Sequence, residues 1–575
     1  MMKIFFIFAL VIPSIALSGQ DLQTVFEQNN NVTATYQECI DYYKLLDKKF
    51  KEITVTEIGP SDVGLPIHLV VVDEDGLKDP KSIRKKNKLI IWINNGIHPG
   101  EPEGIDASMI FARELVKKKE TKELLKNLSF VIVPVYNVGG CLRRNNTSRT
   151  NQNGPEYYGF RGNSNNLDLN RDFVKQDSRN AKTFASGYQL WKPDIFIDNH
   201  TTDGADYPYQ ISLLASMRSK LNPVLGDFMY EKMIPELYEH MKEIGDEMIP
   251  YVEFEEKMED GIFAFNDKSR YSSGYASLFH ALPFIIETHM LKSFPIRVYS
   301  TLNILNTISQ YTSLYKDEII QIRSKALEES LQQLVYPLKW KINLQRMDSL
   351  QMKTFPTVIK FYPNINDSML AYDRRKVILK SIPFYQHYIN AAHAIKPKYY
   401  IIPQAYESVL ENLKRNGIQY SNLESDTLIF GRYYRIEEYK SPTTPYENHF
   451  LHSQVKVIEE QLSYPFYKGD IIVSTNQENV NYILETLEPQ SDDSYFAWNF
   501  FDGILMRKEY FSDYAFAPIA DKELVGRPEL NKSYQEYLAI DSLHSLKMDQ
   551  KLNYIYQKSK FVEPYYNIYP VARIF

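Results

Sequence analysis

Short apolar runs alternate with longer segments of helical periodicity over roughly the first 300 residues of the chain. The apolar runs are bounded by turn-forming residues, and each has the length of one buried strand; they cover residues 67–72, 89–93, 130–135, 194–198 and 283–287. Helical patterns precede, separate or follow them, at residues 36–51, 102–118, 180–191, 224–248 and 302–334. This alternation predicts an α/β fold, in which helices cover both faces of a largely parallel sheet.

The pattern changes after residue 335. Strand-like runs rich in Tyr and Thr dominate residues 427–473, after a short apolar run at 399–403 and one helical pattern at 406–417. We therefore predict three segments: a signal peptide at residues 1–18, an α/β domain at residues 19–335 and a smaller strand-rich accessory domain at residues 336–575.

The first 18 residues have the features of a secretory signal peptide. Lys3 precedes an apolar stretch at residues 4–15, and Ala16-Leu17-Ser18 provides a small-residue cleavage site. The stretch is too short to span a membrane, and no later segment approaches the ~20 apolar residues that a spanning helix requires. We expect export to the periplasm or out of the cell, with no transmembrane segment after cleavage.

Composition narrows the class of protein. The 575 residues are 44% hydrophobic and 24% charged, which is typical of a globular chain with a large core. The net charge of -6 gives no indication of a nucleic-acid partner. The only two cysteines, Cys39 and Cys141, exclude a disulfide scaffold and a Cys-ligated zinc site, and we expect them to be buried thiols rather than a disulfide.

One pair of residues has the spacing of metal ligands at the predicted end of a strand. His98 and Glu101 follow the apolar run at residues 89–93, and zinc accepts neutral imidazole nitrogen together with carboxylate oxygen. His240 and Glu243 share this spacing but lie in a charged helical pattern, so we interpret them as a solvated helix face.

Two other predicted strands also end in polar residues suited to a zinc site. The run at residues 194–198 leads to His200, and the run at residues 283–287 ends in Glu287. Open α/β sheets bind their ligands at the carboxyl ends of strands. His200 is thus the candidate third zinc ligand, and Glu287 is the candidate base for activating water.

A glycine-rich segment between these strands supplies further candidates. It contains Arg161, Asp168, Asn170 and Arg171. A guanidinium group beside zinc can stabilise an oxyanion, and neighbouring Asn and Arg side chains can bind a carboxylate. The alternative, a surface loop with solvated side chains, remains open at this point.

Four motifs in this order resemble the signature of the zinc metallocarboxypeptidases of the carboxypeptidase A type: His98-Pro-Gly-Glu, Asp168-Leu-Asn-Arg-Asp-Phe, Asp-x-His200 and a strand that ends in Glu287. The resemblance covers roughly residues 36–300. It implies an α/β/α sandwich around a mixed sheet of about eight strands, with one zinc ion. The region after residue 335 more loosely resembles the extra domain of some bacterial secreted members.

The resemblance also implies a role for each candidate residue. His98, Glu101 and His200 would bind zinc, Asp168 would orient His98, Glu287 would be the general base, Arg161 would hold the scissile carbonyl oxygen, Asn170 and Arg171 would bind the terminal carboxylate, and Tyr271 would cover the substrate. Arg143, Arg144 and Arg149 are alternatives to Arg161, and Tyr275 is the alternative to Tyr271.

These features together predict a secreted zinc peptidase that hydrolyses the C-terminal bond of a peptide or protein substrate. Two alternatives remain: a zinc amidase or deacylase acting on acylated amino acids or cell-wall peptides, and a catalytically inactive binding protein of the same fold. Residues 272–286 contain no acidic residue, so we expect a neutral or apolar terminal side chain; Asp203 and Asp206 are the candidates for a negatively charged wall.

Overall fold

The computed structural model describes residues 22–254, 258–540 and 545–575. The predicted signal peptide at residues 1–18 lies outside the described residues. Within the described part of the chain, no helix combines the length and the apolar character needed to cross a membrane.

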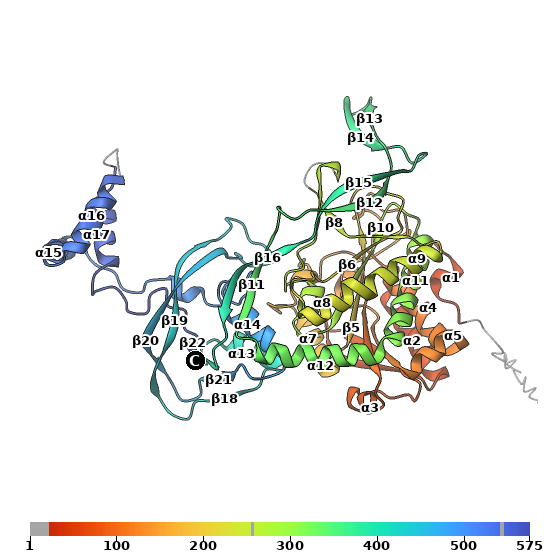
Figure 1. Ribbon diagram of the computed structural model, residues 1–575, viewed down its shortest axis with the longest axis horizontal. Coiled ribbons are helices and arrows are strands. Elements are labelled where there is room, and N and C mark those ends of the chain that lie inside the picture. Colours follow the sequence, from red (N-terminus) through yellow and green to blue (C-terminus); the bar gives the residue numbers. More distant parts are fainter. Residues whose placement is uncertain (1–21, 255–257, 541–544) are drawn as a thin grey trace, which may run out of the picture.

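An eight-stranded sheet forms the centre of the N-terminal region (Figure 1). Its order is β1 (Ile53–Pro60), β2 (Pro66–Val72), β4 (Leu128–Val133), β3 (Leu89–Asn94), β5 (Ile195–Thr202), β10 (Leu282–His289), β6 (Ile211–Ala215) and β7 (Met248–Pro250). The β3–β4, β3–β5, β5–β10 and β6–β7 pairs are parallel. The other three pairs are antiparallel. The predicted mixed, largely parallel sheet of about eight strands is confirmed.

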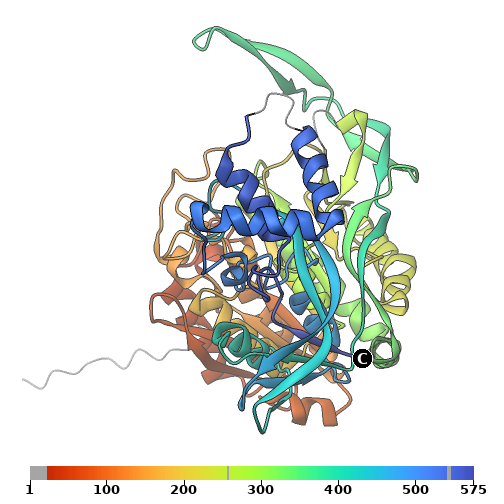
Figure 2. The ribbon, with the colours of Figure 1, turned by 90° about the vertical axis from the view of Figure 1, so that its left-hand side faces the viewer.

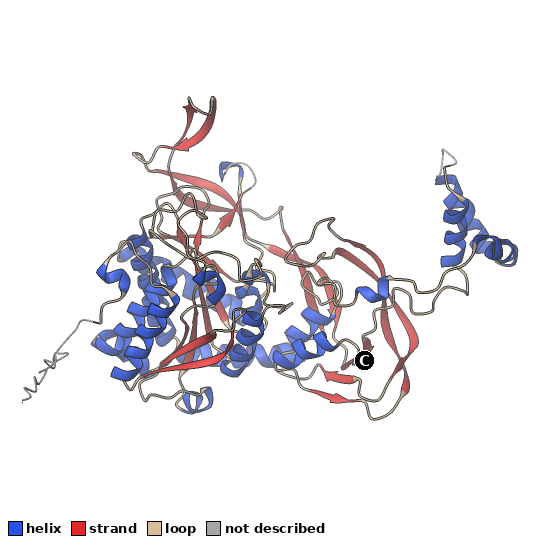
Figure 3. Ribbon diagram, turned by 180° about the vertical axis from the view of Figure 1, so that it is seen from behind, coloured by secondary structure: helices blue, strands red, loops and turns tan. Residues whose placement is uncertain are grey.

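Helices flank this sheet, as Figure 3 shows by colour. The main ones are α2 (Tyr36–Lys49), α4 (Glu103–Lys117), α7 (Arg179–Trp191), α9 (Ile234–Glu243), α10 (Ser272–Ser277), α11 (Phe294–Leu314) and α12 (Lys316–Gln332). The α2 helix begins with a capping box, in which Thr35 accepts from the backbone N–H of Glu38 and Glu38 accepts from that of Thr35. This reciprocal bonding satisfies backbone donors that a helix start would otherwise leave unpaired.

Aromatic side chains pack helices against both faces of the sheet. Trp92 of β3 is in register with Phe196 of β5, and both contact Phe184 of α7. Neighbouring residues of a strand point to opposite faces. Phe130 of β4 therefore lies on the other face, where its ring is 5.2 Å from that of Phe111 in α4. The sheet is buried on both sides, as the apolar runs predicted.

Two helix predictions were wrong in extent. The predicted helix at residues 302–334 is two helices, α11 and α12, because Tyr315 leaves the helical conformation and its hydroxyl donates to the Glu236 carboxylate. The predicted helix at residues 224–248 ends at Glu243, because Gly245 adopts a left-handed conformation that stops the helix. The residues that follow form the edge strand β7.

The region after residue 335 contains most of the remaining strands. A six-stranded sheet has the order β18 (Tyr420–Asn422), β21 (Ile471–Ser474), β17 (Tyr399–Ile402), β22 (Ala572–Ile574), β19 (Thr427–Lys440) and β20 (Ser453–Phe466). The helices α13 (Glu407–Arg415) and α14 (Val480–Leu487) belong to the same region. A group of three helices, α15 (Asp513–Gly526), α16 (Pro528–Ile540) and α17 (Met548–Gln557), projects on the left of Figure 1 and faces the viewer in Figure 2.

Strand pairing crosses the predicted boundary at residue 335. A four-stranded sheet has the order β12 (Asp348–Thr354), β15 (Ile378–Tyr385), β9 (Ile262–Ala264) and β8 (Val252–Glu253). Pairs of later strands also form by themselves: β11 (Val335–Ile342) with β16 (Tyr388–Ile395), and β13 (Thr357–Tyr362) with β14 (Asp367–Tyr372). The two-domain division stays a prediction, and the two segments share a sheet.

Replacing Phe184 with Ala is expected to lower the free energy of unfolding by about 3–5 kcal/mol, because the change leaves a cavity among packed aromatic rings. These rings belong to Trp92, Tyr136, Phe173, Tyr188, Phe196 and Tyr275. Urea unfolding measures the loss. Tyr514→Ala, at a side chain that is 87% exposed, is the aromatic control and should change stability by less than about 0.5 kcal/mol. Equal losses in the two variants would contradict the prediction.

Candidate metal centre and substrate pocket

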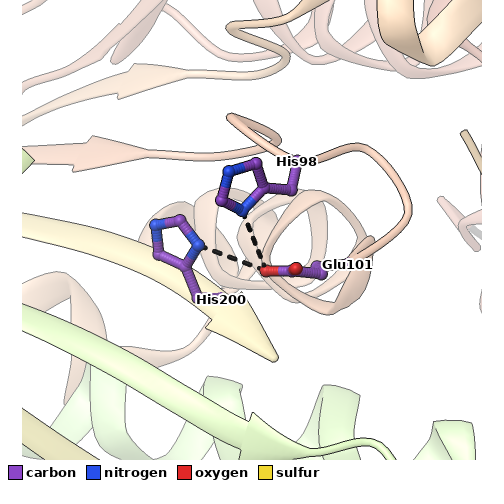
Figure 4. A group of neighbouring side chains, drawn as sticks. All are labelled: His98, Glu101 and His200. Carbon is purple, nitrogen blue, oxygen red and sulfur yellow. Dashed lines mark hydrogen bonds and ion pairs between the residues drawn. The ribbon is translucent and has the colours of Figure 1, made fainter. Parts of the chain in front are cut away.

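His98, Glu101 and His200 converge at the carboxyl ends of two adjacent strands. His98 and Glu101 lie in the tight turn after β3, where the Glu101 N–H donates to the His98 carbonyl oxygen at 2.8 Å. His200 lies near the end of β5. The three side chains point toward one another (Figure 4), and each residue is only 3–4% exposed.

The donor atoms of this cluster fit one metal ion. Nδ1 of His98 is 3.4 Å and Nδ1 of His200 is 3.2 Å from Oε2 of Glu101. Tetrahedral ligands about 2.1 Å from zinc lie about 3.4 Å from one another, which matches both distances. The cluster is the group of His, Cys, Asp and Glu residues in the described chain whose ligand atoms lie close enough to share an ion.

Carboxylates fix the outer nitrogen of each imidazole. Nε2 of His98 is 2.8 Å from Asp168, and Nε2 of His200 is 2.8 Å from Asp198. A carboxylate accepts hydrogen bonds, so each ring carries a hydrogen on Nε2, and when the ring is neutral Nδ1 keeps a lone pair for a metal. Asp168 lies where the sequence analysis expected it. Asp198 was missed, although residues two apart on a strand share a face and His200 follows it at that spacing.

Arg149 supports Glu101 from the other side. Its Nη1 donates to Glu101 Oε1 at 2.8 Å, and its Nη2 donates to the carbonyl oxygen of Thr201 at 3.1 Å. Burial opposes ionisation of Glu101, but the imidazoles of His98 and His200 and the Arg149 guanidinium hold its pKa well below the usual range. Glu101 is therefore in the anionic form that binds a metal.

Among the four arginines that sequence analysis considered, Arg161 lines the pocket at the cluster. Its Nε and Nη2 donate to Asp168 at 3.1 and 2.9 Å. Arg143 and Arg144 instead donate to backbone carbonyl oxygens of nearby loops. Of these four arginines, Arg161 is thus the one whose side chain lines the pocket.

Asn170 and Arg171 also line the pocket, in a short 3-10 turn capped by Asp168. Asn170 Oδ1 accepts from the backbone N–H of Ser272 at 3.0 Å. Arg171 donates from Nη1 to the Asn170 carbonyl oxygen and from Nε to the hydroxyl of Tyr446, both at 3.0 Å. The contact with Tyr446, from the region after residue 335, was not predicted.

Glu287 lies on β10 opposite His200 in the parallel register and reaches the same pocket. Its carboxylate forms no hydrogen bond or ion pair with the residues that the structure describes. Burial raises the pKa of Glu287 to about 8; the His200 imidazole opposes this rise and the Glu101 carboxylate adds to it. A carboxyl group with a pKa near neutrality can take up and release a proton.

The two tyrosine candidates lie in different places. Tyr271 lines the pocket, and its ring centre is 4.5 Å from the Arg171 guanidinium carbon. Tyr275 is fully buried and donates to Asn416, so it cannot reach the pocket. Tyr251 and Phe265 line the pocket as well, and sequence analysis missed both.

The pocket has a volume of about 170 Å³ and one partly apolar wall. Leu214, Ile285 and Phe265 contribute to this wall, and Asp203 lies on the lining. Asp206 does not line the pocket; it pairs with Arg374 at 2.5 Å. Of the two acidic candidates, Asp203 alone lies on the pocket lining.

The residues interpreted as structural behave as such. His240 and Glu243 are 3.9 Å apart on α9, and the Glu243 side chain is 68% exposed. Cys39 and Cys141 are buried free thiols. Burial raises the pKa of the Cys141 thiol to about 11. The thiol is therefore both inaccessible and protonated, and neither property suits a reactive cysteine.

Comparison with known proteins finds similarity to one family. The zinc carboxypeptidase family model matches residues 39–215, which include all three residues of the cluster but end before Glu287. The chain is 19% identical over 452 residues to carboxypeptidase 2 of Trichophyton rubrum and 20% identical over 456 residues to that of Trichophyton equinum; each match covers 75% of this chain and 76% of the relative.

Solved structures that match part of the chain include a metallo-carboxypeptidase from Burkholderia cenocepacia, with 16% identity and a TM-score of 0.37 over 49% of this chain and 70% of that one. Another is a metallo-carboxypeptidase from Pseudomonas aeruginosa in complex with (2-guanidinoethylmercapto)succinic acid, with the same identity and TM-score over 50% of this chain and 70% of that one.

His200→Ala is expected to abolish stoichiometric zinc binding, because it removes one of three donors. Asp198→Asn should keep the donor but weaken zinc affinity about 10–100-fold, because the carboxylate that orients the ring is lost. Elemental analysis and competition with a chelator measure these changes. His240→Ala is the matched control and should bind as much zinc as the unmodified chain. Full zinc content in His200→Ala would refute the assignment.

Proposed function

We propose that this chain, of which residues 39–215 match the zinc carboxypeptidase family model, removes residues one at a time from the C-terminal end of peptides. One observation carries the proposal: the His98, Glu101 and His200 cluster shares a pocket with an unpaired carboxylate, Glu287, and with Arg171. A metal site, a proton acceptor and a group that binds carboxylates therefore lie within reach of one substrate.

The residues of the pocket have complementary proposed roles. A zinc ion held by His98, Glu101 and His200 would supply a Lewis acid, which acidifies water and polarises a carbonyl group. Glu287 accepts a proton from the attacking water and later delivers it to the leaving amine. Arg161 donates to the oxygen of the scissile carbonyl group as negative charge develops there.

Asn170 and Arg171 make the proposed activity specific for a chain end. A terminal carboxylate can accept from the Arg171 guanidinium, whereas an internal peptide segment offers no negative charge there. With an internal segment, the half-buried Arg171 guanidinium group would lack the anionic partner that a terminal carboxylate supplies, so an internal segment binds less well. Tyr271, packed over Arg171, is positioned to cover the bound terminus.

The wall formed by Leu214, Ile285 and Phe265 supports a preference for apolar terminal side chains. Apart from Glu101 and Glu287, Asp203 is the acidic residue on the lining of the pocket, and it follows His200 closely in the sequence. An apolar side chain gains free energy in proportion to the area it buries against this wall, whereas a charged one loses hydration.

Peptides that differ only at the last residue test this proposal. We expect zinc-dependent removal of one residue at a time from free-acid peptides, at least about tenfold faster for terminal Phe or Leu than for Lys, Arg or Glu. Mass spectrometry of the shortened products measures both the stepwise removal of residues and its rate for each peptide. Amidated versions of the same peptides should remain intact. Cleavage of amidated peptides at a similar rate would contradict the specificity for a free chain end. A preference for terminal Lys or Arg would contradict the preference for an apolar terminal side chain.

Glu287→Gln is the matched inactive control, because it keeps the size of the side chain and removes its basicity. Turnover should fall by about 100- to 10,000-fold at unchanged zinc content. Residual activity close to that of the unmodified chain would exclude Glu287 as the base.

We also propose that residues 1–18 direct export. The basic, apolar and small-residue parts of this segment support a cleavable signal peptide. N-terminal sequencing of protein recovered from the periplasm or medium of a bacterial host should begin at about Gly19. Recovery in the cytoplasm with Met1 retained would argue against export.

A further inference from the structure

A tight turn from the region after residue 335 docks against the loop that carries Asp168 and Arg171. Tyr446 and His449 form both backbone hydrogen bonds of the turn, at 2.7 and 3.0 Å. The two residues between them, Glu447 and Asn448, have φ values of 49° and 73°. Left-handed backbone is uncommon for Glu, so the surroundings must hold this conformation. We call residues 446–449 the docking turn.

The first contact of the docking turn is with Arg171. The Tyr446 hydroxyl accepts from Arg171 Nε at 3.0 Å. The ring of Tyr271 packs against the same guanidinium group, and Nη1 donates to the Asn170 carbonyl oxygen. Within the described chain, Nη2 of Arg171 donates to no acceptor. The guanidinium is therefore held at Nε and Nη1, and Nη2 is left for another partner.

The second contact is with Asp168. The Glu447 carboxylate accepts from the backbone N–H of Asp168 at 2.7 Å. Asp168 in turn binds the ring of His98 and the guanidinium group of Arg161. Glu447 thus fixes the backbone of the residue that orients two other groups of the pocket.

The docking turn is itself anchored on both sides. His449 pairs with Asp177 at 2.9 Å, in the segment that follows Arg171. The Tyr446 ring stacks on the buried ring of Trp498, at 6.2 Å and an interplanar angle of 20°. Arg270, one residue before Tyr271, lies over both rings. Aromatic stacking and the hydrogen bond between His449 and Asp177 hold the turn in one position.

We propose that the docking turn is a positioning element of the substrate-carboxylate site, with Tyr446 and Glu447 as positioning residues. Tyr446 fixes the plane of the Arg171 guanidinium, so that Nη2 faces the incoming carboxylate. Glu447 holds Asp168, and through it the start of the turn that carries Asn170 and Arg171. This inference rests on the proposed function, because it assigns the accessory region a part in recognising the terminal carboxylate.

Tyr446→Phe tests the inference, because it keeps the stacked ring and removes the acceptor for Arg171. We expect KM for a free-acid peptide to rise about tenfold, with kcat within about twofold and unchanged zinc content. A purely structural role would not separate KM from kcat. Tyr467→Phe, at an exposed tyrosine of the same region, is the control and should leave both constants unchanged.

The Glu447 contact provides a second pair of variants. Glu447→Ala removes the acceptor for the Asp168 N–H and should also raise KM. Glu447→Gln keeps an acceptor oxygen and should restore KM to within about twofold of the unmodified chain. An equal effect of Ala and Gln, or no effect of either, would overturn the role of this hydrogen bond.

Binding separates this inference from the proposed function. Titration calorimetry of a free-acid peptide and its amide into Glu287→Gln, with and without Tyr446→Phe, measures affinity without turnover. We expect Tyr446→Phe to weaken the free-acid peptide about tenfold and to leave the amide unchanged. Equal free-acid affinities with and without Tyr446→Phe overturn the inference, whether or not the peptide is cleaved. Failure of the unmodified chain to shorten any free-acid peptide overturns the proposed function instead.

Discussion

The parallel pairing of β3, β5 and β10 is the constraint on which the site depends. Parallel strands end at the same edge of a sheet, so polar residues at their carboxyl ends meet without long side chains. The register places Glu287 opposite His200, and the turn after β3 adds His98 and Glu101. A slip of one residue would turn Glu287 to the other face of the sheet. The apolar interior of the strands, which fixes the register, therefore also fixes the chemistry at their ends.

How much could be predicted from the sequence depended on how far apart the interacting residues lie. Strands and the His98 and Glu101 pair follow from local pattern, and His200 and Glu287 from their positions at strand ends. Helix ends at Tyr315 and Gly245 depended on a side-chain contact and a backbone conformation that periodicity does not reveal. The contact between Arg171 and Tyr446 joins residues 275 positions apart, and no spacing rule connects them.

Asp168 shows how one half-buried carboxylate holds several groups of the pocket. One oxygen accepts from His98 and from the backbone N–H of Asn170, and the other accepts from Arg161. Burial opposes its charge, but His98, Arg161 and Arg171 together hold its pKa well below the usual range. The orientation of the His98 ring, of the Arg161 guanidinium group and of the turn that carries Asn170 and Arg171 is thus set by a single anionic group.

The sheet shared by β9 and β15 affects the order in which the molecule can assemble. Ile262 of β9 pairs with Phe384 of β15, and Phe265 of the pocket wall follows β9 directly. The strand before this wall residue thus pairs with one that lies roughly 120 residues later in the chain, and closing so long a loop costs entropy before any contact repays it. During synthesis the first 300 or so residues hold the metal-binding groups but lack this support. The pocket is therefore completed late in folding, after the second half of the chain has been made.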